Sequence, residues 1–312
     1  MNILEEKTET AVELKNLLFA TDFSDASQAA LPYVTALSVR YGSTIHLVHV
    51  LPEVTFLRPG APDPAVMGSI YEDAHSDAQE KIQRISDRLK GFSHMTHVRH
   101  GEICEVLSEI IKEQKIDLVV AGTHGRTGLG KLVMGSVAEQ ILRATTCPVL
   151  TVGPKVVGTV APVPRRNREL PPARINIRQI LYATDFKQES LEAVGYAVSL
   201  AREFRARLAL LHVIEDYGDH LHEHPGPIDG VLQKLQELVS DDSGLRYPPE
   251  ILAQFGLPAE SILQAASERE ADLIVLGVRP ANGHMGAATH LGRAVSHKVI
   301  VGATCPVLTV RS

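Results

Sequence analysis

The chain contains the same sequence pattern twice, and this duplication limits the folds open to it more than any other feature. The segment that begins at Asn16, NLLFATDFSDASQAALPYVTALSVRYGSTIHLVHV, aligns without a gap with the segment that begins at Gln179, QILYATDFKQESLEAVGYAVSLAREFRARLALLHV. Near the two ends, ATTCPVLTV, which ends at Val152, matches GATCPVLTV, which ends at Val310. The repeat is as long as a whole domain and far exceeds the roughly 20 to 50 residues of a solenoid repeat. The sequence therefore predicts two tandem domains.

The length of the chain, 312 residues, also fits two domains of ordinary size. We expect an N-terminal tail at residues 1–14, a first domain at 15–153, a linker at 154–174 and a second domain at 175–312. The linker is rich in proline and arginine, which is typical of an extended tether. A contact of its basic cluster with nucleic acid or with an acidic partner is the less favoured alternative.

Composition and charge narrow the class of protein further. The chain has 31 basic and 37 acidic residues and a net charge of −6, so its overall charge favours neither nucleic acid nor an anionic membrane as a partner. Three cysteines are too few for a disulfide framework, and the acidic N-terminus does not resemble a signal peptide. No apolar run is long enough to span a bilayer. We expect a soluble cytoplasmic protein.

Each copy alternates short apolar runs with helical patterns, which is typical of an α/β fold. In the first copy we expect strands near 16–20, 44–50, 95–99, 116–121 and 148–152, and helices near 25–40, 69–90, 103–114 and 136–144. The run DLVVA, at residues 117–121, lacks the alternation of a half-exposed strand, so helices should cover both faces of the sheet. We expect two doubly wound domains, each with five parallel strands and a ligand site at the carboxyl ends of its strands.

A glycine-rich loop follows the fourth strand of the first copy. It has the spacing Gly-x2-Gly-x9-Gly-Ser, from Gly122 through Gly125 to Gly135 and Ser136, and a helix pattern comes directly after it. Glycine lets a backbone approach a ligand closely, and a helix that starts near Ser136 directs backbone N–H groups at an anion. Arg126 adds positive charge. The loop predicts a polyphosphate site, and a flexible crossover with a helix cap is the alternative.

On these residues the sequence resembles the universal stress protein family in its tandem two-domain form. The resemblance rests on ATDF after the first strand, LVHV in the second strand, the glycine loop and the closing CPVLTV strand, and it covers the chain apart from the tail and the linker. It implies two Rossmann-like domains of the adenine nucleotide alpha hydrolase-like type. It also implies ATP as the cofactor, with or without Mg²⁺.

The resemblance further implies which residues of the first domain bind ATP. The adenosine side consists of Ala20, Thr21, Asp22 and Val50, and the phosphate side consists of Gly122, His124, Gly125, Arg126, Gly135, Ser136 and Val137. The chemistry of Asp22 supports its place, since its oxygens can accept from an adenine amino group or a ribose hydroxyl. The alternative is that Asp22 only caps the next helix.

The second copy has lost the loop. Arg279 and Pro280 replace His124 and Gly125, and Arg293 and Ala294 replace Gly135 and Ser136. Proline has no N–H to donate, arginine brings a side chain where close approach was needed, and alanine has no hydroxyl group. We expect no ATP in the second domain, and a residual anion site at its two arginines is the alternative.

Two groups of histidines resemble metal sites, but the favoured interpretations are a polar loop for one group and an exposed strand for the other. One group, in a polar segment, consists of His220, His222 and His224; the other, on an expected exposed strand, consists of His94, His97 and His100. Cys147 and Cys305 precede proline in both copies and have no partner base in the sequence, so we expect them to be small buried residues. We therefore predict no metal site and no catalytic residue.

The two closing strands are each expected at a sheet edge, which proteins usually cover. The resemblance implies that these strands pair the two domains within one chain and that two chains form a homodimer. We expect a nucleotide-dependent stress-response protein whose first domain binds ATP. The alternatives are a slow ATPase or nucleotide hydrolase and an interaction protein that needs no nucleotide. The loop has no carboxylate to hold Mg²⁺ or to position water, which argues against an enzyme.

Overall fold

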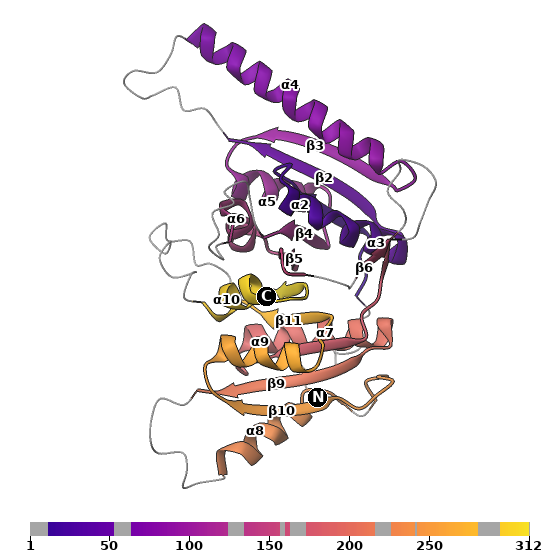
Figure 1. The fold of residues 1–312 in the computed structure, drawn as a ribbon, viewed down its shortest axis with the longest axis vertical. Helices are drawn as coiled ribbons and strands as arrows, with labels where there is room; N and C mark the ends of the chain where they lie inside the picture. Colours follow the sequence, from indigo (N-terminus) through magenta and orange to yellow (C-terminus); the bar gives the residue numbers. More distant parts are fainter. Residues whose placement is uncertain are drawn as a thin grey trace.

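The computed structural model describes residues 12–52, 64–123, 134–156, 160–162, 173–215, 226–240, 242–279 and 294–311. The chain forms one ten-stranded sheet in the order β10-β9-β8-β11-β12-β5-β4-β1-β2-β3, with helices on both faces (Figure 1). Each half of the sheet is parallel, and the two halves meet where β5 and β12 pair in antiparallel fashion. The fold class is thus the expected one, an α/β fold with two parallel five-stranded halves.

The first domain follows the expected order of elements. Its strands are β1 (Asn16–Ala20), β2 (Thr44–Leu51), β3 (His94–His100), β4 (Leu118–Gly122) and β5 (Val149–Val152). Its helices are α2 (Asp25–Ala29), α3 (Leu31–Tyr41), α4 (Pro64–Arg88), α5 (Ile103–Glu113) and α6 (Ser136–Ala144).

The second domain repeats the order of the first. Its strands are β8 (Gln179–Ala183), β9 (Arg207–Ile214), β10 (Glu250–Phe255), β11 (Leu273–Gly277) and β12 (Val307–Val310). Its helices are α7 (Gln188–Phe204), α8 (Gly226–Gln236), α9 (Pro258–Glu268) and α10 (Val295–Gly302).

One expected helix of the first domain is divided in two. The prediction of a single helix over 25–40 is wrong, because α2 and α3 meet at Ala30. Pro32, in the first turn of α3, has no N–H to donate to a carbonyl four residues earlier, so the hydrogen-bond ladder is interrupted there. The second copy has Gly195 at this position, which does have an N–H, and α7 runs without a break.

The central strands are largely apolar because alternate side chains enter two different cores. Leu17 and Phe19 of β1 pack into the core that holds α3, α4 and α7, whereas Leu18 packs into the core that holds α5, α6, α9 and α10. All three side chains are fully buried. Both faces of the sheet are therefore covered, which explains why its strands lack a polar-apolar alternation.

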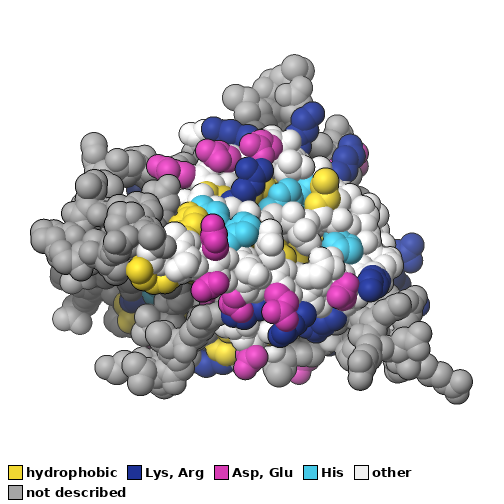
Figure 2. All heavy atoms as spheres, turned by 90° about the horizontal axis from the view of Figure 1, so that it is seen from above, with side chains coloured by type: hydrophobic (Ala, Val, Ile, Leu, Met, Phe, Trp, Pro, Cys, Tyr) yellow, Lys and Arg dark blue, Asp and Glu magenta, His cyan; other side chains and the backbone are white. Residues whose placement is uncertain are grey.

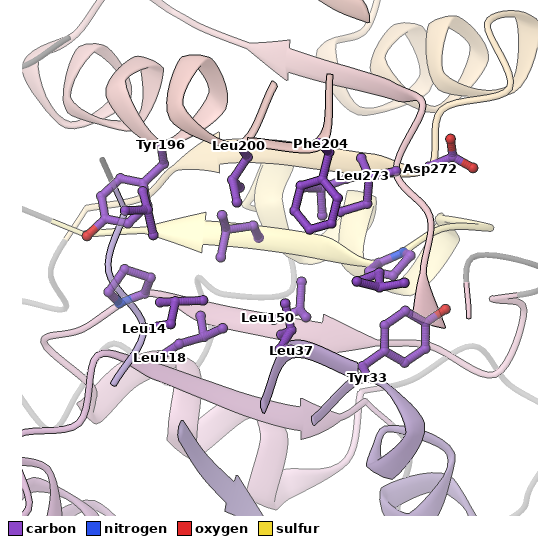
Figure 3. A pocket seen from close by; sticks show the side chains of 16 residues that line it. Leu14, Tyr33, Leu37, Leu118, Leu150, Tyr196, Leu200, Phe204, Asp272 and Leu273 are labelled. Atoms are coloured by element: carbon purple, nitrogen blue, oxygen red, sulfur yellow. The ribbon is translucent and has the colours of Figure 1, made fainter. Parts of the chain in front are cut away.

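The seam between the halves is closed by backbone and side-chain contacts. The hydroxyl groups of Thr151 and Thr309 donate to carbonyl oxygens of the opposite strand at 3.0 and 3.3 Å. On one face, side chains of α3 and α7 and of the strands approach one another around an apolar pocket of about 30 Å³ (Figure 3). Arg40 of α3 pairs with Glu203 of α7 at 2.8 Å beside this pocket. The two domains thus share one apolar core.

Strands form at both ends of the segment that was expected to be an extended linker. Strands β6 (Val160–Pro162) and β7 (Ala173–Ile175) pair in antiparallel fashion and lie against α3. Val160 and Ile175 are partly buried against the core of the domains, and this apolar contact accounts for the order. None of the described helices is both long and apolar enough to cross a membrane.

Candidate functional site

A cavity of about 450 Å³ lies at the carboxyl ends of β1 and β4 in the first domain. These strands are neighbours in the sheet, but the chain leaves β1 for helices on one face and leaves β4 for α6 on the other. The helices therefore diverge at this point and leave a crevice, as in other doubly wound sheets. The expected ligand position thus coincides with a cavity in the structure.

Asp22, directly after β1, lies half-buried in the wall of this cavity. Its Oδ1 atom accepts hydrogen bonds from the backbone N–H of Ser24 at 2.9 Å and from the hydroxyl group of Ser24 at 2.5 Å. Burial raises the pKa of Asp22, but these hydrogen bonds and one from Ser27 outweigh it, so the pKa lies below its usual value. The carboxylate is therefore ionised at neutral pH.

The cap of α2 is Ser24 rather than Asp22. The Oγ atom of Ser24 accepts from the N–H of Ser27 at 3.1 Å, which is the usual bond of an N-cap serine. Asp22 acts one step earlier, because it holds the Ser24 hydroxyl group in place. Asp22 therefore supports the helix cap indirectly, and its carboxylate also lies on the cavity wall.

Three residues beside Asp22 fix the shape of the wall at the predicted adenosine side. The Thr21 hydroxyl group lies 3.0 Å from that of Ser27 and accepts from the N–H of Phe23 at 3.0 Å. The Nδ1 atom of His49 lies 2.7 Å from the carbonyl oxygen of Thr21, so this nitrogen carries the proton. The ring of His49 packs on that of Phe23 at 4.3 Å. Thr21 thus acts from inside the wall, whereas Phe23 and His49 face the cavity.

Gly122, at the end of β4, is required by packing. A Cβ atom at this position would lie 2.3 Å from the carbonyl oxygen of Ala26 in α2, well inside contact distance. Gly277 is in the same situation, with Glu189 O at 2.2 Å. Because both copies need this glycine so that the helix after the first strand, α2 or α7, can pack against it, its retention in the second copy carries no information about phosphate.

Gly135 differs from Gly122 in this respect. It is the N-cap residue of α6, and its φ of −64° is open to any amino acid, so the backbone conformation does not demand glycine. Its N–H donates to the carbonyl oxygen of Thr123 at 2.8 Å, which fixes the start of α6 at the cavity. Gly135, Val137 and Ala138 line the cavity, so the first turn of α6 and its unpaired N–H groups lie at this wall.

Helix α4 contributes two charged residues that the sequence analysis missed. Asp77 and Lys81 line the cavity and form an ion pair at 2.5 Å, one turn apart on the helix. Nothing in the local sequence distinguishes this pair from other exposed pairs on α4, such as Arg84 with Glu80. Only the position of α4 across the end of the sheet, visible in Figure 1, brings Lys81 to the cavity.

The structure brings most of the predicted binding residues together. Those that line the main cavity are Ala20, Asp22, Val50, Gly122, Gly135 and Val137. Thr21 lines an adjoining pocket of about 30 Å³, and Ser136 is the first residue of α6. His124, Gly125 and Arg126 lie outside the described residues.

The second domain has a cavity of its own, of about 660 Å³, at the same place in its half of the sheet. Asp185, Thr184 and His212 repeat the arrangement of the first cavity, and the His212 Nδ1 atom lies 2.8 Å from the Thr184 carbonyl oxygen. The electrostatics differ, because Lys187 takes the place of Ser24 and its ammonium group pairs with Asp185 at 2.7 Å. Pro280 and Arg293 lie outside the described residues.

The other candidate side chains have protein partners. His97 pairs with His46, His100 pairs with His75, and Figure 2 shows histidine side chains on the face that carries α4 and β3. Within the described ranges, no three His, Cys, Asp or Glu residues are grouped as metal ligands would be. His220, His222 and His224 lie outside these ranges. Burial raises the pKa values of Cys147 and Cys305 to about 12, so both thiols are protonated at neutral pH.

Comparison with known proteins identifies the family. The model of the universal stress protein family matches residues 13–153 and 176–311. A universal stress protein of Mycolicibacterium smegmatis is 26% identical over 309 residues, which cover 95% of this chain and 96% of the relative. Universal stress protein A homolog 1 of Coxiella burnetii is 30% identical over 138 residues, which cover 44% of this chain and 95% of the relative.

Solved structures agree on the fold. A universal stress protein from Archaeoglobus fulgidus superposes with a TM-score of 0.64 at 19% identity, over 95% of this chain and 98% of that one. The two family matches fall on the two copies of the sequence repeat and on the two halves of the sheet. The chain therefore belongs to the universal stress protein family and carries two of its domains in tandem.

Proposed function

We propose that the first cavity binds ATP and that the protein acts in the stress response through the nucleotide-bound state of this domain. The observation that supports this most is the pairing of two chemistries in one crevice. An ionised carboxylate, Asp22, lies on one wall, and the first turn of α6 lies on the other with Gly135 at its start. The carboxylate suits an amino or hydroxyl donor, and a helix start suits phosphate.

The cavity fits ATP in size, and two features of its wall suit a phosphate group. A volume of about 450 Å³ lies within the range of small-molecule sites. Gly135 keeps the helix start clear of a side chain, and Lys81 can pair with a phosphate in exchange for Asp77. In this proposal the adenosine lies against Ala20, Asp22 and Val50. Arg126 and His124, from the glycine loop, complete the phosphate side.

The second domain serves as a structural partner in this proposal and binds no ATP. Ala294 takes the place of the serine at the start of α10, and Lys187 already neutralises Asp185. Its closing strand β12 completes the sheet against β5. We further propose that the protein acts in the cytoplasm and that two chains form a homodimer, which cell fractionation and light scattering of the purified protein would check.

The decisive experiment identifies the nucleotide that the protein carries. Purified protein is denatured without added ligand, and released nucleotides are separated by chromatography and identified by mass spectrometry. We expect close to one ATP per chain. Two per chain would contradict the assignment of the second domain, whereas none, together with no heat on titration with ATP, would contradict ATP binding itself.

Hydrogen exchange then locates the site. ATP should slow amide exchange at residues 122–136 and in the first turn of α6, because these N–H groups become hydrogen-bonded to phosphate. Helix α10, the counterpart of α6 in the second domain, is the internal control and should exchange at an unchanged rate. Equal protection of both helices, or of neither, at saturating ATP would overturn the proposed site.

A further inference from the structure

The second cavity differs from the first in the charge of its walls. Among the described residues, the second cavity is lined by the basic side chains of Lys187, Arg279 and Arg311 and the acidic side chains of Asp185 and Glu215. The described lining of the first cavity has one basic side chain, Lys81, and two acidic ones, Asp22 and Asp77. The excess charge thus changes from acidic to basic between the two cavities.

The basic side chains of the second cavity differ in their interaction partners. Lys187 is paired with Asp185 at 2.7 Å, so these two charges cancel. Arg279 has only a 3.5 Å contact between its Nε atom and Glu189. Arg311 donates to the carbonyl oxygens of Arg143 and Thr145 at 2.7 and 3.2 Å. Two guanidinium groups therefore lie at this cavity, and of the two only Arg279 has a carboxylate partner among the described residues.

One N–H group of Arg311 makes no hydrogen bond to the described residues. Its Nε–H is buried and has no hydrogen-bond partner within the described part of the chain. A buried donor without an acceptor is uncommon in proteins, so the donors of Arg311 are not fully used by the protein itself. Burial also lowers the pKa of Arg311.

The first domain has no equivalent of Arg311. The aligned closing strands place Gly153 at this position. An added Cβ atom at Gly153 would approach the carbonyl oxygens of Ile300 and Ala303 at 3.7 and 3.9 Å, at the end of α10, in the way that Arg311 approaches the end of α6. Because the backbone surroundings are alike, the arginine is a specific addition to the second cavity.

Part of the wall of the second cavity is apolar. Leu142 from the first domain, together with Ile262, Leu276 and Ile300, lines it alongside the two arginines. A volume of about 660 Å³ accommodates an organic molecule larger than a simple ion. The walls therefore combine an apolar surface with two cationic groups, and they come from both domains.

We propose that the second cavity binds an organic anion, a carboxylate, sulfonate or phosphate ester on an apolar body, with its acid group against Arg279 and Arg311 and its body against Leu142, Ile262 and Ile300. This site is separate from the proposed ATP site. It is formed jointly by the second domain and by α6 of the first, so the ligand contacts both domains.

A matched pair of fluorescent probes tests the proposal on the full chain. 8-Anilinonaphthalene-1-sulfonate carries a sulfonate on an apolar ring system, and N-phenyl-1-naphthylamine has the same rings without the charge. We expect the sulfonate to bind with about one probe per chain and at least about tenfold more tightly than the neutral probe. Titrations at saturating ATP keep the probes away from the first cavity.

Charge-removing variants locate the probe. Arg279→Ala, which leaves the seam between the domains intact, should weaken sulfonate binding about tenfold and leave neutral-probe binding unchanged, and Arg311→Leu should do the same. The matched control is Lys81→Ala, which removes a cation from the first cavity. Lys81→Ala should leave sulfonate binding at saturating ATP unchanged, so failure of the ATP proposal and failure of this one are distinguishable. Equal affinity for the two probes, or sulfonate binding that Arg279→Ala leaves unchanged, would overturn the proposal.

Discussion

The two cavities share one scaffold and differ in the residues that meet a ligand. In both, a threonine hydroxyl group accepts from the N–H of the following phenylalanine, at Phe23 and Phe186, and both phenylalanines have a positive φ. In both, a histidine ring packs on this phenylalanine, at 4.3 and 4.5 Å. The comparison teaches that the ATDF segment is retained because it builds the turn after the first strand.

The differences are concentrated at three places. The start of the helix after the fourth strand has Gly135 and Ser136 in one copy and Arg293 and Ala294 in the other. Two residues after the aspartate that follows the first strand, the first copy has Ser24 and the second copy has Lys187, which pairs with Asp185. The closing strand is followed by Gly153 in one and by Arg311 in the other. Four changes thus convert one wall chemistry into another without altering the fold.

The largest expected effect comes from copying the second domain into the first. Gly135→Arg should weaken ATP binding at least about 100-fold, because the side chain occupies the start of α6 where phosphate would lie. The melting temperature should change little, since the position is at a loop end. Calorimetric titration with ATP measures the first effect and thermal unfolding the second.

A control variant separates this effect from charge alone. Gly68→Arg places the same side chain on α4 at a position with nothing within 4 Å. Its ATP affinity should match that of the parent protein. Retained ATP binding in Gly135→Arg would show that the start of α6 is not the phosphate site.

The next effect concerns the glycines at the ends of β4 and β11. Gly122→Ala and Gly277→Ala should each lower the free energy of unfolding by about 3 kcal/mol, because the new methyl group would collide with the backbone of α2 or α7, respectively. Urea denaturation measures both. Gly230→Ala, in open space on α8, is the control and should raise the free energy of unfolding by about 0.5–1 kcal/mol. A large loss in only one of the two copies would contradict the shared structural role.

A smaller effect is expected at the charged pair on α4. Lys81→Ala should weaken ATP binding by a factor of about 3 to 10, and the loss should shrink as salt is added. The reason is that Lys81 can exchange Asp77 for phosphate at the cavity wall. Lys90→Ala, which removes an exposed lysine that pairs with Asp87 and does not line the cavity, is the control for titration calorimetry. Equal affinities in the two variants would exclude Lys81 from the site.

The smallest effect is the pH dependence of the two aspartates. Hydrogen bonds outweigh the effect of burial and lower the pKa values of both Asp22 and Asp185 in the folded protein. A lowered folded-state pKa contributes stability above the unfolded value of about 4, and this stability is lost as the pH falls through the folded-state pKa. Asp22→Asn and Asp185→Asn should therefore each be less stable than the parent at pH 7, by under about 1 kcal/mol, and the difference should shrink as the pH falls below about 4 and disappear below the folded-state pKa.

Salt distinguishes the two aspartates in the same urea experiment. Asp185 is paired with an exposed lysine, whereas Asp22 is held by a serine. Added salt should therefore reduce the effect of Asp185→Asn more than that of Asp22→Asn. An equal response to salt would show that Lys187 contributes nothing to the second site.

Local sequence predicted the elements well and the site in part. The duplication, the apolar strands and the start of α6 at Ser136 all depend on neighbours in the chain, which a single sequence displays. The break between α2 and α3 was also visible in principle, because Pro32 is in the sequence and Gly195 stands opposite it. The position of Asp77 and Lys81 in the cavity wall could not be predicted. Local sequence defines their helix, but it does not define how this helix packs on the sheet.

The sequence by itself determined that this chain folds as two copies of one domain and that only the first copy keeps the glycine loop. The tertiary structure decided which residues share a cavity. It showed that Gly122 is a packing residue, that Lys81 reaches the first cavity, and that Arg311 joins the second cavity to α6. The physical reason is that periodicity and turn chemistry act between near neighbours, whereas a cavity wall is formed by residues far apart in the chain, whose meeting depends on how whole helices pack.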